Sequence, residues 1–443
     1  MAEITAKRAP AYLKDAVVYQ INLRAFTLDG TLKAAERLLP HIASLGADIV
    51  YLCPVTLADD DPRREFWSDR QKKSELENPK NIYRVGDYYA VDPEYGTDDD
   101  LKSFVAEAHK LGLRVILDLV YYHCGPAAVF LDEHPDFVVR EADGSVKNGH
   151  WHFPELNFES PALREYLWEN MEYFVRDFDV DGYRCDVAGA VPLDFWEEGR
   201  RRIDALKPDL IMLSETFSAE TPEQRAAFEM SYGGTLGTLC GVLAGTQDSA
   251  AVRRDWEEKS AQSVPGSRFL RGFDNHDIAN DQYEKRLETF VPAEKIEAAF
   301  ALSFALDGVP FLYNGQEIAD SRRHSIFGNR FFGQNLVVDW ANAVTPAGER
   351  RVAFLKKLIE FRRAHPALTE GRTVWIDNDA PDQLLTFRRE SKGETLFVAV
   401  NLGDSEQTVP GAAGAVLLAS EKAGLNGRGE AVLPPFGFLI REA

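Results

Sequence analysis

The chain has 443 residues, 45% of them hydrophobic, so it can bury a large core and carry more than one domain. It holds 50 Lys and Arg against 71 Asp and Glu, a formal net charge of −21 at pH 7. A surface this acidic repels phosphate backbones and anionic lipids, which argues against nucleic acid and membrane surfaces as partners. Aromatic residues make up 11% of the chain and suit a cleft in which flat rings stack.

The N-terminal stretch MAEITAKRAPAYLKDA has neither the apolar core nor the cleavage site of a secretion signal. No apolar run approaches the ~20 residues that a membrane span needs. The cysteines Cys53, Cys124, Cys185 and Cys240 follow no metal-binding or disulfide spacing. We therefore expect free thiols and a cytoplasmic protein, although export by another route stays open, as does the oligomeric state.

Strand-like and helix-like segments alternate along most of the chain. TLKAAERLLPHIASLG predicts one helix that Thr31 caps and Gly46 ends, and GTDDDLKSFVAEAHKLG predicts another that Thr97 caps. A third helix is expected from Ser160 to about residue 177. LRVILDLV is a continuous apolar run, as expected for a strand that is buried on both faces. The expected strands are 17–22, 47–55, 113–120, 180–187, 210–215, 227–232, 268–274 and 309–313.

This number of strands, alternating with helices, is what a closed (β/α)8 TIM barrel requires. A doubly wound open sheet is the alternative, but no GxGxxG follows an early strand. After the third strand, a segment rich in His, Gly, Pro and aromatic residues indicates a small inserted subdomain, and the short alternating strands near the end are typical of an antiparallel β-sandwich. We predict an α/β fold with the barrel over 1–120 and 160–363, the inserted subdomain over 121–159 and a C-terminal β-sandwich domain over 366–443.

Acidic residues stand at the C-terminal ends of several expected strands, the edge where TIM barrels place their active sites. Asp186 follows GYRC, Glu215 follows LIMLS and Asp277 follows FDNH. Arg184 and Asp186 share a face of their strand, so we expect the guanidinium to keep Asp186 ionised, as a nucleophile requires. Glu215 ends an apolar run, which favours a carboxyl that keeps its proton and acts as a general acid. A glycosidase uses two carboxyls in these opposite protonation states.

The segments DLVYYH, GYRCD, LSETF and FDNHD resemble, in order and spacing, four conserved regions of the α-amylase family, glycoside hydrolase family thirteen. FPELN resembles a further region in the family's inserted domain, and the resemblance covers about residues 12–363. It implies a retaining α-glycosidase that hydrolyses maltooligosaccharides or related α-glucans. A transglycosylase or disaccharide isomerase with the same covalent intermediate is one alternative, and a non-catalytic sugar-binding protein is another.

The resemblance also implies roles for single residues. Asp186 is expected to be the nucleophile, Glu215 the general acid and base, and Asp277 the acid that binds sugar hydroxyls and stabilises the transition state. Four further residues are expected to bind substrate. Arg184 orients Asp186, His123 and His276 form hydrogen bonds with the sugar, and Tyr83 stacks on it. Asp118 is expected to be structural.

Three positions depart from the family pattern. Gly189 and Ala190 stand where the family often has Lys and His on the leaving-group side, which leaves the substrate open. Tyr122 stands where the family has a calcium-binding Asn. Because calcium needs hard oxygen ligands that these positions do not supply, we expect no metal here and no cofactor.

Other motifs lie outside the four regions. His150 and His152 argue only weakly for zinc, because no third ligand is evident, and are more typical of a loop near the cleft. Trp67 is either a sugar platform or a loop anchor. Asp320 and Arg323, after the eighth strand, are candidates for the wall of the cleft.

Overall fold

The computed structural model describes residues 9–216, 227–263, 266–279, 286–328, 336–410 and 414–443. Parallel strands close into a barrel in the order β1, β10, β9, β8, β7, β6, β5, β2. Their bounds are β1 (Val18–Ile21), β2 (Ile49–Leu52), β5 (Arg114–Leu119), β6 (Gly182–Cys185), β7 (Ile211–Ser214), β8 (Met230–Ser231), β9 (Arg268–Arg271) and β10 (Val309–Tyr313). Each strand lies within a segment expected from the sequence, so the predicted TIM barrel is confirmed.

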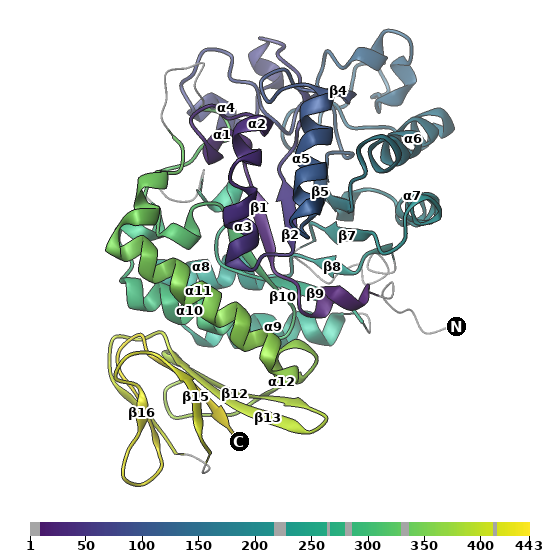
Figure 1. Cartoon of the computed structure of the whole chain (residues 1–443). Coiled ribbons are helices and arrows are strands. Elements are labelled where there is room, and N and C mark those ends of the chain that lie inside the picture. The colour runs from purple at the N-terminus through teal and green to yellow at the C-terminus, as the bar shows by residue number, and fades with distance from the viewer. Residues whose placement is uncertain (1–8, 217–226, 264–265, 280–285, 329–335, 411–413) are drawn as a thin grey trace, which may run out of the picture.

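Helices cover the outside of the barrel (Figure 1). α5 begins after Thr97, whose side-chain oxygen accepts from the backbone N–H of Asp100, while the Asp100 carboxylate accepts from the N–H of Thr97. α6 begins after Ser160, as predicted. The helix bounds are α1 (Leu23–Phe26), α5 (Asp98–Lys110), α6 (Pro161–Phe178), α7 (Leu193–Leu206), α8 (Thr235–Ala244), α9 (Ala250–Gln262), α10 (Ala293–Ala305), α11 (Pro346–Ala364) and α12 (Pro366–Thr369). Within the described ranges, none of these helices is both long enough and apolar enough to cross a bilayer.

The helix expected from Thr31 to Gly46 is two helices, α2 (Leu32–Glu36) and α3 (Leu39–Leu45). Thr31 caps the first, and Gly46 ends the second with a φ of 101°. Pro40 explains the break, because proline lacks the N–H that would continue α2 but is well tolerated in the first turn of a new helix. The prediction of one continuous helix was therefore wrong, although both of its ends were right.

Two segments stand outside the barrel, next to the C-terminal ends of its strands. β3 (Thr56–Ala58) pairs antiparallel with β4 (Val85–Val91), and the chain between them includes η2 (Arg64–Phe66) and α4 (Asp69–Lys73). Residues 120–160, between β5 and α6, contain short 3-10 helices and isolated bridges, such as the one between His123 and Glu155. That residues 121–159 form a separate subdomain stays a prediction. Among the residues that the structure describes, the 3-10 helices are η1 (Ala11–Lys14), η2, η3 (Val129–Leu131), η4 (Pro135–Phe137), η5 (Ala188–Ala190), η8 (Leu287–Thr289), η9 (Gln316–Ile318) and η11 (Trp340–Val344).

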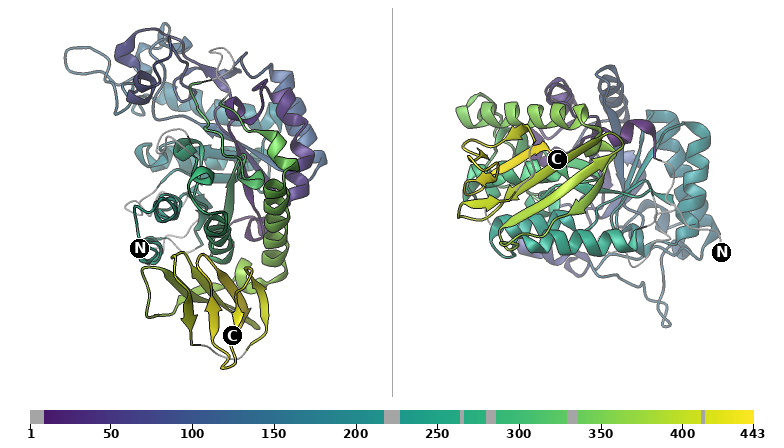
Figure 2. Two further views of the ribbon diagram at one scale, coloured as in Figure 1. Left: turned by 90° about the vertical axis from the view of Figure 1, so that its left-hand side faces the viewer. Right: turned by 90° about the horizontal axis from the view of Figure 1, so that it is seen from below.

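The C-terminal region folds into two antiparallel sheets, of orders β11-β12-β13-β18-β15 and β14-β17-β16, which confirms the predicted antiparallel β-structure of this region. Phe397 and Leu439 of the larger sheet pack with Val409 and Leu433 of the smaller one. The sheets lie beneath α11 and α12, at the opposite end of the molecule from β4 (Figures 1 and 2). The strand bounds are β11 (Arg372–Trp375), β12 (Leu384–Ser391), β13 (Glu394–Asn401), β14 (Gln407–Val409), β15 (Val416–Ala419), β16 (Gly424–Leu425), β17 (Ala431–Leu433) and β18 (Phe438–Glu442).

A buried carboxylate at the entry to β6 links three elements of the barrel. One oxygen of Asp181 lies 2.8 Å from Nε2 of His109 and accepts from the N–H of Val115 at 2.7 Å. The other oxygen lies 2.9 Å from Nζ of Lys207. Burial alone would raise the pKa of Asp181, but these partners outweigh it and hold the pKa below its ordinary value. The stabilisation is therefore present above about pH 4 and is lost as the pH falls through the pKa of the folded state.

Asp181→Asn is therefore expected to lower the free energy of unfolding at pH 7 by about 1–3 kcal/mol, because buried donors lose a charged acceptor. Thermal unfolding at pH 7 and at pH 3 measures this, and the difference from wild type is expected to shrink at the lower pH. Asp177→Asn is the control, because Asp177 pairs with Arg176 at the surface. Equal unfolding temperatures for the two variants at pH 7 contradict the prediction.

Candidate active site

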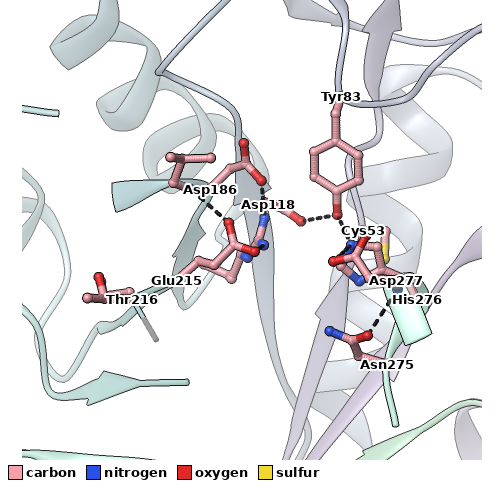
Figure 3. A network of polar contacts seen from close by, with 12 residues as sticks. Cys53, Tyr83, Asp118, Asp186, Glu215, Thr216, Asn275, His276 and Asp277 are labelled. Carbon is pink, nitrogen blue, oxygen red and sulfur yellow. Dashed lines mark hydrogen bonds and ion pairs between the residues drawn. The ribbon is translucent and has the colours of Figure 1, made fainter. Parts of the chain in front are cut away.

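The two expected catalytic carboxylates follow neighbouring strands of the barrel, Asp186 after β6 and Glu215 after β7. Arg184 of β6 contacts both: its Nη1 lies 2.8 Å from Oδ1 of Asp186, and its Nη2 lies 2.8 Å from Oε1 of Glu215. Because neighbouring nitrogens of one guanidinium hold the two groups, the carboxylates must lie side by side (Figure 3). The structure thus brings the predicted pair together at the mouth of the barrel.

Asp118 of β5 supports this arrangement from below. Its Oδ1 lies 2.6 Å from Nη1 of Arg184, and its Oδ2 accepts hydrogen bonds from the hydroxyls of Tyr51 at 2.7 Å and Tyr83 at 3.0 Å. The side chains of Arg184 and Asp118 are 1% and 0% exposed, so neither is in contact with solvent. Asp118 therefore positions Arg184 and Tyr83, in agreement with its expected structural role.

The backbone directly after Asp186 is strained and donates a hydrogen bond to Glu215. Val187 has a φ of 44°, a conformation that β-branched residues avoid and that costs on the order of 1–3 kcal/mol. In this conformation its N–H donates to Oε2 of Glu215 at 2.8 Å. Glu215 is thus held at both oxygens, by Val187 and by Arg184.

The protonation of the pair differs in part from the prediction. Burial raises the pKa of Asp186 well above its usual range and outweighs Arg184, which lowers it; the charge of Glu215 raises it further. Burial also raises the pKa of Glu215, again against Arg184. Arg184 acts on Asp186 in the expected direction, but burial and the charge of Glu215 outweigh it, and the raised pKa of Glu215 agrees with its prediction. Two adjacent buried carboxylates resist double ionisation, which favours a state with one proton on the pair.

Asp277, in the loop after β9, lies beside an arginine that the sequence did not reveal. Oδ1 of Asp277 is 2.6 Å from Nη1 of Arg70 on α4. Burial raises the pKa of Asp277, but His276, Arg70 and Arg184 together lower it to about 2. Asp277 is therefore a fixed anion at neutral pH, unlike the pair of Asp186 and Glu215. No sequence motif marks Arg70, which is far from Asp277 along the chain.

The hydrogen-bond network fixes the protonated nitrogen of His276. Its backbone N–H donates to Oε1 of Gln20 at 3.2 Å, so the amide nitrogen of Gln20 faces Nδ1 of the ring, at 2.8 Å. Because an amide nitrogen only donates, Nδ1 accepts and Nε2 carries the proton. Nε2 then donates to the hydroxyl of Tyr83 at 2.6 Å, and the Tyr83 ring stacks with the imidazole at 5.3 Å (Figure 3).

His123 is the second expected sugar-binding histidine. Its Nε2 donates to the carbonyl oxygen of Tyr83 at 2.8 Å, and burial lowers its pKa to about 4, so the ring is neutral at pH 7. Within the described part of the chain, its Nδ1 has no hydrogen-bond partner. The rings of Phe153 and Trp151 flank the imidazole, with ring centroids 4.9 and 5.5 Å from its own.

These groups surround a cavity of about 300 Å³. All the predicted site residues line it except Arg184, which lies beneath the carboxylates. The loop that the sequence predicted near the cleft reaches the cavity through Trp151, which lies between His150 and His152. The cavity residues that it missed are Ser68, Arg70, Asn81, Phe153, Val187, Leu236, Gly237, Asn275, Ile278 and Ile326.

Other candidates lie away from this cavity. Trp67 is only 3% exposed and is therefore a loop anchor. Asp320 is buried and contacts Nε2 of His324 at 2.9 Å, while Arg323 is exposed, so the expectation that they line the cleft was wrong. The hydroxyl of Tyr122 donates to Oε1 of Glu155 at 2.7 Å. The absence of calcium at the Tyr122 position stays a prediction.

Comparison with known proteins places the chain in a family. The family described as alpha amylase, catalytic domain, matches residues 13–143 and 146–347, and a domain of unknown function, DUF3459, matches residues 379–440. Alpha-amylase 2 from Dictyoglomus thermophilum is 24% identical over 441 residues, which cover 90% of this chain and 71% of that protein. The maltogenic alpha-amylase of Bacillus acidopullulyticus is 26% identical over 456 residues, which cover 91% of this chain and 72% of that protein.

Among solved structures, the maltogenic alpha-amylase AmyB from Thermotoga neapolitana has the same fold, with a TM-score of 0.80 and 23% identity over 97% of this chain and 98% of that one. The match to the catalytic-domain family spans every strand of the barrel and the loops that carry Asp186, Glu215 and Asp277. The chain therefore belongs to the α-amylase family, glycoside hydrolase family thirteen.

Proposed function

We propose that this glycoside hydrolase cleaves α-glucosidic bonds of short maltooligosaccharides, with Asp186 as the nucleophile and Glu215 as the general acid and base. One observation carries the assignment: Arg184 holds these two carboxylates side by side at the wall of a cavity. The family membership and the names of the relatives, an alpha-amylase and maltogenic alpha-amylases, support the substrate class.

The mechanism needs one proton on the pair, carried by Glu215 while Asp186 is ionised. In the first step, Asp186 attacks the anomeric carbon while Glu215 gives its proton to the departing glycosidic oxygen. The product is a glycosyl ester of Asp186, and Glu215 is left as a carboxylate that Arg184 stabilises. In the second step, Glu215 takes a proton from water, the resulting hydroxide bonds to the anomeric carbon and Asp186 departs.

The groups opposite the pair bind and stabilise the sugar. Asp277 is ionised, so its carboxylate accepts hydrogen bonds from sugar hydroxyls and stabilises the positive charge that develops on the ring. Tyr83 supplies an aromatic face, His276 holds the Tyr83 hydroxyl in place, and the Nδ1 atom of His123 is a hydrogen-bond acceptor at the cavity. Trp151 adds an apolar wall on the side of the segment between β5 and α6.

The size of the cavity supports a short substrate. Its volume of about 300 Å³ is at the low end of small-molecule sites. Such a space accommodates a few sugar rings of an oligosaccharide.

Product analysis on maltotriose tests the proposal. We expect glucose and maltose to form, because water is the acceptor in the second step, and a slower release of sugar from amylose than from maltotriose at equal mass concentration. The measurement is a chromatographic time course over maltose, maltotriose, isomaltose and amylose. Longer oligomers at early times indicate transfer to a sugar hydroxyl, and no cleavage of any α-linked substrate overturns the proposed function.

A further inference from the structure

We propose that Arg70 is a positioning residue for the reaction: it enters the cavity from α4 and holds the carboxylate of Asp277 in the orientation that meets the sugar. The inference rests on the proposed function, because it assumes that Asp277 binds the substrate. Arg70 lies outside the four sequence regions that identify the family. It comes from the segment between β3 and β4 and lines the same cavity as Asp186 and Glu215.

The segment that carries Arg70 is fixed on both sides of it. The hydroxyl of Ser68 accepts from the N–H of Gln71, and Oε1 of Gln71 accepts from the N–H of Ser68, both at 3.1 Å. Nε2 of Gln71 also donates to the carbonyl oxygen of Pro79 at 2.9 Å. Ser68 and Gln71 are 1% and 0% exposed, and the preceding Trp67 is buried as well. Arg70 therefore extends from a helical turn whose neighbours are anchored in the protein.

The contact between Arg70 and Asp277 leaves room for a sugar. Nη1 of Arg70 lies 2.6 Å from Oδ1, whereas Oδ2 lies on the side of His276, 3.4 Å from Nε2. The Nε2 proton of His276 already points to the hydroxyl of Tyr83. Asp277 is 26% exposed at its side chain and lines the cavity. One oxygen is thus held by the arginine, and the other remains accessible to a sugar hydroxyl.

The charges around Asp277 show why a second arginine is needed. The groups that act on it are His276 on its own loop, Arg70 on α4, Arg184 on β6 and Glu215 on β7. Arg184 is engaged by Asp118, Asp186 and Glu215. Arg70 makes the direct ion pair with Asp277. Without it, burial and the charge of Glu215 favour a protonated or rotated Asp277, which stabilises the transition state poorly.

A double-mutant cycle tests the inference. Arg70→Gln, Asp277→Asn and the double variant are compared with wild type for kcat and KM on maltotriose. We expect Arg70→Gln to lower kcat by about 10- to 100-fold, the cost of a displaced catalytic group, with a smaller change in KM. Because Arg70 acts through Asp277, adding Arg70→Gln to Asp277→Asn is expected to cause no further loss. Arg70→Lys keeps the charge and is expected to recover part of the lost kcat.

The matched control is Lys73→Gln, which removes a cation from an exposed position of the same helix. It is expected to leave kcat, KM and the unfolding temperature unchanged. If Arg70→Gln has the kcat of wild type, or if its loss multiplies fully with that of Asp277→Asn, the positioning role is wrong. These outcomes require an active wild type and an impaired Asp277→Asn variant. An inactive wild type, or an Asp277→Asn variant with full activity, instead overturns the proposed function and the inference that rests on it.

Discussion

Asp186→Asn is expected to lower kcat on maltotriose by about 10⁴-fold or more, the order of loss seen when an enzyme loses its nucleophile. Asparagine keeps the shape of the side chain, but its neutral amide does not form the ester intermediate. Arg184 keeps Asp118 and Glu215 as partners, so the site is expected to stay assembled. Initial rates from quantified glucose and maltose measure the loss.

The fold of the variant provides a separate check. The pKa of Asp186 is raised, which means that its charge is held at a cost in this buried site, so Asn is expected to leave the unfolding temperature equal to or above that of wild type. Asp194→Asn is the control, because Asp194 pairs with Arg164 at the surface and lies away from the cavity. Turnover by Asp186→Asn at the rate of this control would show that Asp186 is not the nucleophile.

The barrel could be predicted because its strands are short, parallel and covered on both faces. Such strands read as continuous apolar runs, and β5 and β10 are examples in which nearly every residue is buried. The smallest strands of the C-terminal sheets gave no comparable signal. β14 and β16 contain three and two residues, too few to show an alternation of buried and exposed positions. They form only because β17 lies between them.

The positions of the site residues and the raised pKa of Glu215 could be predicted, but the raised pKa of Asp186 could not. The spacing of Arg184 and Asp186 on a strand correctly placed the two side chains together. The same spacing suggested an ionised Asp186, because the sequence does not show that Asp118 and Glu215 share the one guanidinium. The number of carboxylates around a buried cation is a property of the packed barrel, and it decides which pKa values rise.

The contact between Arg70 and Asp277 could not be predicted either, because it joins segments that are far apart in the sequence. Arg70 lies in a stretch rich in charged residues, close to Lys72 and Lys73, and the sequence does not show which of these cations reaches the cavity. The turn formed by Ser68 and Gln71 selects Arg70 for the cavity. The sequence pattern of Ser68 and Gln71 fits a capping box, but it does not show that Asp277 is the partner of Arg70.

Glu215→Gln is expected to separate the two steps of the reaction. On maltotriose, kcat is expected to fall by about 10²- to 10⁴-fold, because the departing oxygen no longer receives a proton. On α-glucosyl fluoride the first step is expected to proceed, because fluoride departs without protonation. The second step then lacks its general base, so the glycosyl ester on Asp186 accumulates. Intact-mass measurement is expected to show a protein carrying one glycosyl group.

The geometry around residue 215 makes this variant a clean test. The amide oxygen of Gln can accept from the N–H of Val187 as the carboxylate does, whereas its amide nitrogen cannot replace the oxygen that faces Nη2 of Arg184, so one of the two contacts is kept while the acid function is lost. Asp186→Asn is the matched comparison, because it is expected to be inactive on both substrates. If the first step on the fluoride slows as much as turnover of maltotriose, so that no glycosyl ester accumulates, the role of Glu215 as acid and base is contradicted. The wild type adds a pH criterion: activity on maltotriose falls as pH rises through the raised pKa of Glu215, whereas the first step on the fluoride does not share this dependence.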